Sequence, residues 1–182
     1  MLIGLTGKAR SGKNSVANVL VHAGGFMEFA FADALKKAAS EVFHAPLVHF
    51  YADDKKEVVD DYWGMSPRNM LQKLGTEACR EIFGQDVWIK SLVKKLSDYD
   101  TFDIVVTDVR FENEAAMVRE RGGVVIHVIS DRETTLETST QAHASEAGVA
   151  LHDEDYQIYN NGTLADLSLS ALSVYAMIKD LK

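Results

Sequence analysis

Short apolar runs alternate along this chain with segments in which apolar residues recur at helical spacing. A short apolar run predicts a buried strand, whereas apolar positions three and four residues apart predict an amphipathic helix. The predicted strands are 2–6, 26–31, 102–107, 124–129 and 156–159. The predicted helices are one after residue 12, then 33–43, one opened by Ser66 and Pro67, 86–96, 112–121 and 164–181. The alternation favours an α/β fold with a central parallel five-stranded sheet and helices on both faces.

The segment between the first predicted strand and the first predicted helix has the spacing Gly-x4-Gly-Lys of a phosphate-binding loop. In such a loop, backbone N–H groups converge on phosphate oxygens and the helix N-terminus adds partial positive charge. The lysine supplies a full charge for the outer phosphates. The predicted phosphate ligands are Gly7, Lys8, Ala9, Arg10, Ser11, Gly12, Lys13, Asn14 and Ser15. An ordinary glycine-rich turn is the alternative, but strand, loop, lysine and helix in register favour a nucleoside triphosphate site.

Asn14 follows the lysine at the position where Ser or Thr commonly binds Mg²⁺, and the hydroxyl comes one residue later, at Ser15. One residue on a helix is a rotation of about 100°, so Ser15 occupies a different place. The order Gly-Lys-x-Ser resembles the loops of small nucleotide kinases, in which the shifted hydroxyl contacts an inner phosphate.

Ligands of parallel α/β sheets lie at the carboxyl ends of the strands, which draws attention to the residues after 102–107. Asp108 is predicted to hold a metal ion or a water, with capping of the next helix as the alternative. Arg110 lies on the same side of an extended chain and is predicted either to pair with Asp108 or to contact a substrate phosphate. Glu114 falls in the first turn of the next helix, where the helix dipole alone favours a carboxylate.

Arg68 and Gln72 are four residues apart and share one face of the helix opened by Pro67. An arginine near a helix N-terminus opposes the dipole, and an anionic ligand would offset that repulsion. Arg80 is expected to be an ordinary surface charge. Trp88 is expected to be either a core residue or a wall of a nucleobase site.

The polar segment at about 131–148 joins two predicted strands and shows neither helical nor alternating periodicity. It is predicted to be a small mobile lid that carries Arg132 over the transferring phosphate. His143 and Glu146 are expected to tie this lid together. A static surface loop is the alternative.

A length of 182 residues predicts a single domain, 1–182, and a net charge of −8 argues against a nucleic-acid polymer as partner. Cys79 is the only cysteine, so a disulfide within the chain and a zinc site built from cysteines are excluded. The sequence also shows neither a secretory leader nor an apolar run of membrane-spanning length. A cytoplasmic location without membrane attachment is therefore expected.

With these segments identified, the chain resembles the bacteriophage-type deoxynucleoside monophosphate kinases. The matching segments are spread over about four-fifths of the chain: 4–15, 31–36, 66–77, 82–84 with Trp88, 107–114 and 143–146. The resemblance implies a P-loop kinase fold with an acceptor-binding helical insertion at about 45–98. It further implies transfer of the γ-phosphoryl group of ATP to a deoxynucleoside monophosphate, with Mg²⁺ as the metal. The host cytoplasm is the implied location if the chain is of phage origin.

The same resemblance implies roles for individual residues. The implied catalytic residues are Lys13, Asp108 and Arg110, to which the predicted lid adds Arg132. The implied contacts to the acceptor are Asp33, Lys36, Arg68, Gln72, Gly75, Trp88, Arg110 and Glu114. Members of the family often carry Asp where this chain has Asn14. If that carboxylate organises Mg²⁺ in the family, this chain must rely on Asp108 or on phosphate oxygens instead, and the metal is assigned to Asp108.

Two other functions stay open from the sequence. Dephospho-CoA kinase shares the opening Gly-Leu-Thr-Gly and a similar loop, although the segments 67–77 and 108–114 fit it less well. A nucleotide-dependent switch or binding module would hydrolyse ATP slowly and would have no acceptor site. The accepted bases, the discrimination of deoxyribose from ribose and association into a homodimer are left open.

Overall fold

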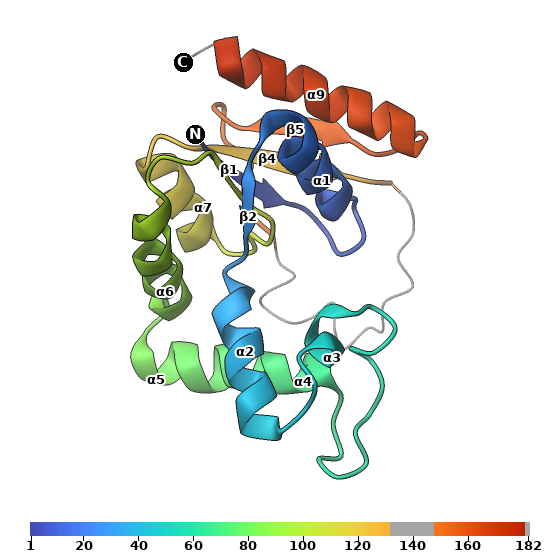
Figure 1. Cartoon of the computed structure of the whole chain (residues 1–182), viewed down its shortest axis with the longest axis vertical. Helices are drawn as coiled ribbons and strands as arrows, with labels where there is room; N and C mark the ends of the chain where they lie inside the picture. The colour runs from blue at the N-terminus through green and yellow to red at the C-terminus, as the bar shows by residue number, and fades with distance from the viewer. Residues whose placement is uncertain (132–147, 181–182) are drawn as a thin grey trace. The chain divides into compact units, whose positions relative to one another are not determined.

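The computed structural model describes residues 1–131 and 148–180, which form parts of two compact units (Figure 1). The first unit joins Met1–Ala30 to Asp100–Lys182, and the second unit is Phe31–Tyr99. The predicted helical insertion at 45–98 falls within the second unit. That unit begins earlier than the prediction, at Phe31.

The described residues of the first unit contain a five-stranded parallel sheet in the order β2-β3-β1-β4-β5. Its strands are β1 (Leu2–Thr6), β2 (Met27–Phe29), β3 (Ile104–Val106), β4 (Val124–Ile129) and β5 (Tyr156–Tyr159). The predicted sheet is therefore confirmed, with β2 and β3 shorter than expected. Phe102 is half exposed and precedes the pairing of β3, whereas Ala30 and Phe31 already lead out of β2 toward the next helix.

Helices cover both faces of this sheet, as the alternation of elements predicted. In the described residues of the first unit the helices are α1 (Lys13–Gly24), α7 (Glu112–Glu120) and α9 (Leu164–Asp180). Helices α1 and α9 lie side by side on one face and bury Val16, Leu20, Leu167 and Ile178 against it (Figure 1). Helix α7 lies on the other face. No helix among the described residues is long and apolar enough to cross a bilayer.

Gly4, in the middle of β1, allows α7 and the segment before it to approach the sheet closely. An ideal Cβ at Gly4 would lie 3.0 Å from Val109 Cγ2 and 3.1 Å from Val118 Cγ2. Both valines are fully or almost fully buried, so a larger residue would push α7 away from β1. This close packing fixes the position of the chain just after β3.

The second unit is helical in its described residues. Its helices are α2 (Ala32–Phe43), α3 (Val48–Tyr51), α4 (Pro67–Gln72), the π-helix η1 (Lys73–Arg80), α5 (Glu81–Phe83), α6 (Val87–Leu96) and the 3₁₀ turn η2 (Ser97–Tyr99). A small core of Ala39, Ala45, Phe50 and Met70 holds α2, α3 and α4 together. As predicted, Ser66 caps α4, because its Oγ accepts from Asn69 N at 3.4 Å, and Pro67 is the first helical residue.

Candidate active site

The predicted phosphate loop connects β1 to α1 and is held in shape by its own lysine. Lys13 Nζ donates to the carbonyl oxygens of Gly7 at 2.7 Å and Lys8 at 2.8 Å. Gly7 and Gly12 have φ of 141° and 107°, in the region that favours glycine. An ideal Cβ at Gly7 would lie 2.2 Å from the carbonyl oxygen of Val128, so glycine is required there for packing as well.

Ser11 lies inside this loop and presents an unsatisfied hydroxyl. Its residue is 3% exposed, and its Oγ has no hydrogen-bond partner among the described residues. A buried hydroxyl without a partner costs free energy unless a ligand or water satisfies it. Because this oxygen is almost inaccessible from the surface, a buried water fits it better than a phosphate group does.

Asn160 is a residue of this region that the sequence analysis missed. It follows β5 directly, is 8% exposed, and its Nδ2 donates to the Ser11 carbonyl at 2.9 Å. The rule that ligands lie at the carboxyl ends of parallel strands applies to β5 as well as to β3. Applied there, it would have drawn attention to Asn160.

Asp108 and Arg110 lie at the same edge of the sheet as the phosphate loop. Val109 N donates to the Leu5 carbonyl at 3.1 Å, so the chain after β3 runs beside the end of β1. Asp108 is partly exposed and Arg110 is exposed. The predicted roles of both side chains toward metal and phosphate stay predictions, and their position at the carboxyl edge is the one those roles require.

Glu114 caps the start of α7. Capping this helix was the alternative role considered for Asp108. Its residue is 2% exposed, and its Oε2 accepts from Arg110 N at 2.8 Å and from Phe111 N at 3.2 Å. These two amides belong to the unpaired donors at the helix start. The cap accounts for the burial of this carboxylate, and contact of Glu114 with a substrate stays a prediction.

In the second unit, Asp33 and Lys36 on α2 both engage Tyr51 of α3. Tyr51 Oη donates to Asp33 Oδ1 at 2.9 Å, and Lys36 Nζ lies 4.0 Å from the centre of the Tyr51 ring. Lys36 thus makes a cation–π contact. The structure brings these two predicted acceptor contacts together through a tyrosine that the sequence analysis did not single out.

Gly75 and Trp88 are joined by a hydrogen bond, from Trp88 Nε1 to the Gly75 carbonyl at 3.0 Å. Gly75 is buried against α2, where an ideal Cβ would lie 2.5 Å from Leu35 Cδ2. Leu35 is between Asp33 and Lys36 in sequence. Four of the predicted acceptor residues therefore gather around the start of α2. Trp88 is half-buried and so is neither a wholly buried core residue nor a surface one.

Arg68 is paired with Glu57, a partner that its helix does not supply. Arg68 Nε lies 2.6 Å from Glu57 Oε1, with the arginine side chain 18% exposed. Gln72 follows on the same side of the helix and is partly exposed. An anion that binds Arg68 at its Nε has to compete with the carboxylate of Glu57.

Arg80 corrects one expectation of the sequence analysis. It is 4% exposed rather than a surface charge, and its Nη1 donates to the Gln85 carbonyl at 2.7 Å. A buried guanidinium needs hydrogen-bond acceptors, and the turn after α5 supplies one. Its role is to hold the end of η1 to the residues before α6.

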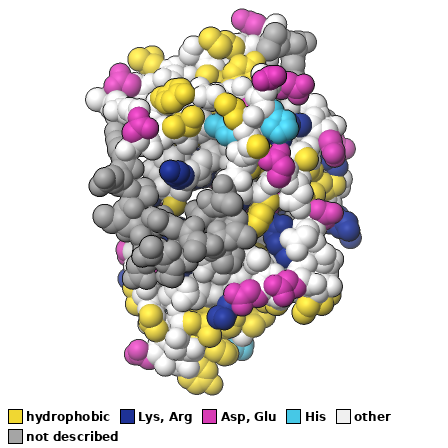
Figure 2. All heavy atoms as spheres, turned by 180° about the vertical axis from the view of Figure 1, so that it is seen from behind, with side chains coloured by type: hydrophobic (Ala, Val, Ile, Leu, Met, Phe, Trp, Pro, Cys, Tyr) yellow, Lys and Arg dark blue, Asp and Glu magenta, His cyan; other side chains and the backbone are white. Residues whose placement is uncertain are grey.

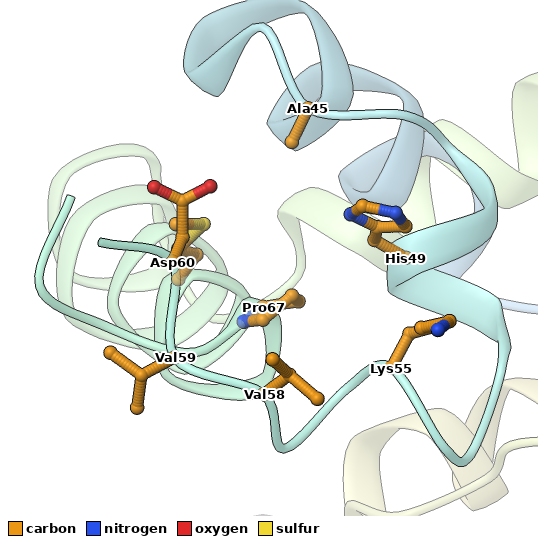
Figure 3. A pocket seen from close by; sticks show the side chains of 8 residues that line it. Ala45, His49, Lys55, Val58, Val59, Asp60 and Pro67 are labelled. Carbon is orange, nitrogen blue, oxygen red and sulfur yellow. The ribbon is translucent and has the colours of Figure 1, made fainter. Parts of the chain in front are cut away.

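A pocket of about 240 Å³ also lies in the second unit (Figure 3). His49 and Lys55 stand on one side of it and Asp60 on the other. Pro67 and Met70 contribute the face of α4 that Arg68 and Gln72 do not share. The pocket contains none of the predicted acceptor residues.

Arg132, His143 and Glu146, and with them nearly all of the predicted lid at 131–148, lie outside the described residues. Within residues 1–131 and 148–180, no group of three or more His, Cys, Asp or Glu side chains is placed to hold a metal ion. Mg²⁺ at phosphoryl-transfer sites is commonly held by one or two carboxylates together with substrate phosphates. Asp108 at the carboxyl edge fits that pattern.

A charge cluster binds the segment before β5 to α7 and β4. The Asp155 side chain is 1% exposed; its Oδ2 lies 2.7 Å from Arg119 Nη2 and 3.0 Å from His127 Nε2. Its Oδ2 also accepts from His152 N at 3.0 Å. Figure 2 shows histidine, acidic and basic side chains side by side on one face of the molecule.

The ionisation of this cluster follows from its hydrogen bonds. Burial raises the pKa of Asp155, but the bonds from Arg119, the His152 amide and His127 outweigh it, so the pKa lies below its usual range. The hydrogen bond to Asp155 also raises the pKa of Arg119, against the effect of burial. Burial likewise raises the pKa of Glu112. The hydrogen bonds from Arg119 and from the Ala150 amide lower it by more, so the pKa of Glu112 lies below its usual value.

The parallel sheet, the phosphate loop after its central strand and the helices on both faces together define a P-loop kinase fold. Solved structures support this assignment of the fold. A dephospho-CoA kinase from Campylobacter jejuni has a TM-score of 0.54 at 16% identity, over 97% of this chain and 96% of that one. A gluconokinase from Sinorhizobium meliloti 1021 has a TM-score of 0.54 at 17% identity, over 98% of this chain and 94% of the gluconokinase chain.

Sequence comparison identifies the family within this fold. The profile of the deoxynucleotide monophosphate kinases matches residues 45–170. A protein of Acanthamoeba polyphaga mimivirus whose name assigns it to these kinases is 34% identical over 190 residues, 95% of each chain. The chain belongs to the deoxynucleotide monophosphate kinase family.

Phage members of the family are longer. The deoxynucleotide monophosphate kinase of Escherichia phage RB69 is 36% identical over 112 residues, which are 60% of this chain and 43% of the phage protein. That of Enterobacteria phage T4 is 33% identical over 114 residues, 60% of this chain and 44% of the phage protein. The match to these two proteins spans less than half of their length.

Proposed function

We propose that this chain transfers the γ-phosphoryl group of ATP to a deoxynucleoside monophosphate, giving ADP and a deoxynucleoside diphosphate. The observation that carries the proposal is the phosphate loop that follows β1, with the Lys13 ammonium held within it. Membership of the family supplies the acceptor class.

The donor half of the reaction is assigned to the carboxyl edge of the sheet. The loop amides, Lys13 and Ser15 would bind the phosphates of ATP, and Asp108 would hold Mg²⁺ directly or through water. When bound, the metal neutralises charge on the donor phosphates. Positioning and electrostatic stabilisation account for most of catalysis in phosphoryl transfer, so the mechanism needs no nucleophilic side chain of the protein.

The acceptor half is assigned to the second unit. Arg68 and Lys36 supply cations for the phosphate of the acceptor. Trp88 offers a ring face for the base, while its indole N–H is held by Gly75. Arg110, which follows β3, would contact the transferring phosphate.

A coupled assay of ADP release against a panel of acceptors tests this function. The panel contains the four deoxynucleoside monophosphates, the ribonucleoside monophosphates and dephospho-CoA. Stimulation by a deoxynucleoside monophosphate supports the proposal. Stimulation by dephospho-CoA alone would assign the chain to that kinase, and slow ATP hydrolysis that no acceptor stimulates would indicate a switch or binding module.

We infer that the reaction takes place in the cytoplasm of an infected host cell, where ATP and nucleoside monophosphates are available. The relatives from a mimivirus and from phages support this location. The partner proposed for the chain is a small molecule.

Arg68→Ala is expected to raise the KM for the acceptor by about 10- to 100-fold and to leave the KM for ATP nearly unchanged. A hydrogen bond to a charged group contributes about 1.5–3 kcal/mol, and the change removes it from one substrate only. Steady-state kinetics with each substrate varied in turn measure both constants. Arg121→Ala, a change of an exposed arginine, serves as control. Equal weakening of ATP and acceptor would exclude a specific acceptor role for Arg68.

Asp108→Asn is expected to lower kcat by on the order of 100-fold while changing either KM by less. A carboxylate that holds the metal stabilises charge mainly in the transition state, so its loss appears in kcat. Asp100→Asn, at an exposed position in the same unit, is the matched control. Unaltered kcat in folded Asp108→Asn would remove Asp108 from the chemistry.

A further inference from the structure

Asn160 joins three segments that are far apart in sequence at the carboxyl edge of the sheet. Its backbone N donates to the Ile129 carbonyl at 2.7 Å, and its carbonyl accepts from Ser130 Oγ at 3.2 Å. These two bonds fix its backbone to the end of β4. Its side chain then reaches the phosphate loop, where Nδ2 donates to the Ser11 carbonyl at 2.9 Å in a buried contact.

This contact sets the direction of a backbone amide. The Ser11 carbonyl and the Gly12 N–H belong to one peptide unit, and no cis peptide bond occurs among the described residues. In a trans peptide the C=O and the N–H point in opposite directions. When Asn160 holds the Ser11 carbonyl on one side of the loop, the Gly12 N–H is therefore directed to the other side.

The loop itself restrains this peptide unit weakly. Gly12 has φ of 107°, and glycine at such a position has more freedom than any other residue. Gly12 packs against α9 and against Asn160, the residue that follows β5. An ideal Cβ at Gly12 would lie 2.6 Å from Asn160 Nδ2 and 3.1 Å from Leu167 Cδ2. Asn160 is thus tightly fitted against the residue whose amide it orients.

We propose that Asn160 is a positioning residue of the phosphate loop, whose side-chain amide orients the Gly12 N–H toward the nucleotide phosphates. The inference rests on the proposed binding of ATP by this loop. Asn160 acts through the Ser11–Gly12 peptide and does not itself touch the phosphates. A preformed array of donors lowers the cost of ordering the loop when an anion binds.

Asn160→Leu tests the proposal because leucine is close to asparagine in size and has no donor. Titration calorimetry is expected to show an affinity for ADP reduced by about 10-fold or more. An effect of this size corresponds to the loss of one hydrogen bond that leaves the Ser11 carbonyl unsatisfied. The KM for ATP is expected to rise, and the KM for the acceptor to stay within about twofold. Asn18→Ala, which removes an exposed amide from α1, is the matched control.

Asn160→Asp supplies a second test that depends on proton donation rather than on size. A neutral carboxyl can donate to the Ser11 carbonyl, whereas a carboxylate cannot. The ratio of the ADP dissociation constants of variant and wild type is therefore expected to fall as the pH is lowered from 8 to 5. A ratio that stays constant from pH 8 to pH 5 would contradict the proposal.

The outcomes separate this proposal from the proposed function. Failure of the wild-type chain to bind ADP or ATP would contradict the proposed function itself. Wild-type ADP affinity in Asn160→Leu, together with unfolding at lower urea, would make Asn160 a structural residue only and overturn the proposal. If Asn160→Leu does not fold, the pH dependence of Asn160→Asp decides in the same way.

Discussion

Lys13→Ala is expected to lower kcat by on the order of 100- to 1,000-fold, because the lysine charge acts mainly on the outer phosphates as the transfer proceeds. Removing one preorganised donor to charge that develops in the transition state raises the activation free energy by on the order of 3 kcal/mol. Lys13 Nζ bonds to the Gly7 and Lys8 carbonyls, which hold the ammonium group within the loop. Single-turnover kinetics with saturating ATP and acceptor measure the effect.

The fold is expected to survive this substitution, since Lys13 is not a core residue and its two bonds lie at an exposed position. The urea midpoint of Lys13→Ala should therefore stay close to that of the wild type. Lys37→Ala, an exposed lysine on α2, should leave both kcat and the urea midpoint unchanged. Wild-type turnover by folded Lys13→Ala would contradict the assignment of the phosphate loop.

Asp155→Ala is expected to lower the free energy of unfolding by about 3–5 kcal/mol at neutral pH, a large part of the 5–15 kcal/mol of a typical domain. The change removes the carboxylate partner of Arg119 Nε (3.1 Å) and Nη2 (2.7 Å), in a side chain that is 13% exposed. The Ala150 carbonyl, at 3.4 Å from Nη2, is retained. The substitution also removes the acceptor of His127 Nε2. Urea unfolding measures the loss, and Asp153→Ala, at an exposed position nearby, should shift the midpoint little.

The same carboxylate makes stability depend on pH in a defined direction. Because the pKa of Asp155 is lower in the folded state, its contribution is complete above the ordinary aspartate pKa of about 3.9. Below that pH the unfolded chain takes up a proton that the folded chain resists, so the free energy of unfolding falls. Glu112, whose pKa is also lowered, acts in the same direction. Asp155→Asn should flatten this decline, and an equally steep decline in the variant would assign it to other carboxylates.

The sheet and the phosphate loop could be predicted because their signals are local. The apolar run of β1, the glycine spacing of the loop and Lys13 lie within fifteen residues of one another, and no distant contact is needed to interpret them. The capping of α4 by Ser66 could also be predicted, since an N-cap depends on residues within the first turn of its own helix.

Other features depend on contacts between distant residues and could not be predicted in this way. Arg80 looked like a surface charge because its burial is decided by how the turn at Gln85 folds back. The pairing of Arg68 with Glu57 crosses a polar stretch that has no periodicity. The π-helix η1 changes the hydrogen-bond register, and its buried residues are Gly75 and Arg80, so the pattern of apolar positions does not reveal it.

The order of strands has a consequence for the growing chain on the ribosome. β1 is synthesised first, but both of its neighbours in the sheet, β3 and β4, lie more than a hundred residues later. The hydrogen bond from Asn160 to Ser11 spans 149 positions. In contrast, Phe31–Tyr99 makes its own core from residues close in sequence and emerges in one piece. The phosphate loop is therefore synthesised before β3, β4 and Asn160, the segments that complete its surroundings. We expect a nascent chain to gain nucleotide affinity only after β5 and Asn160 have emerged.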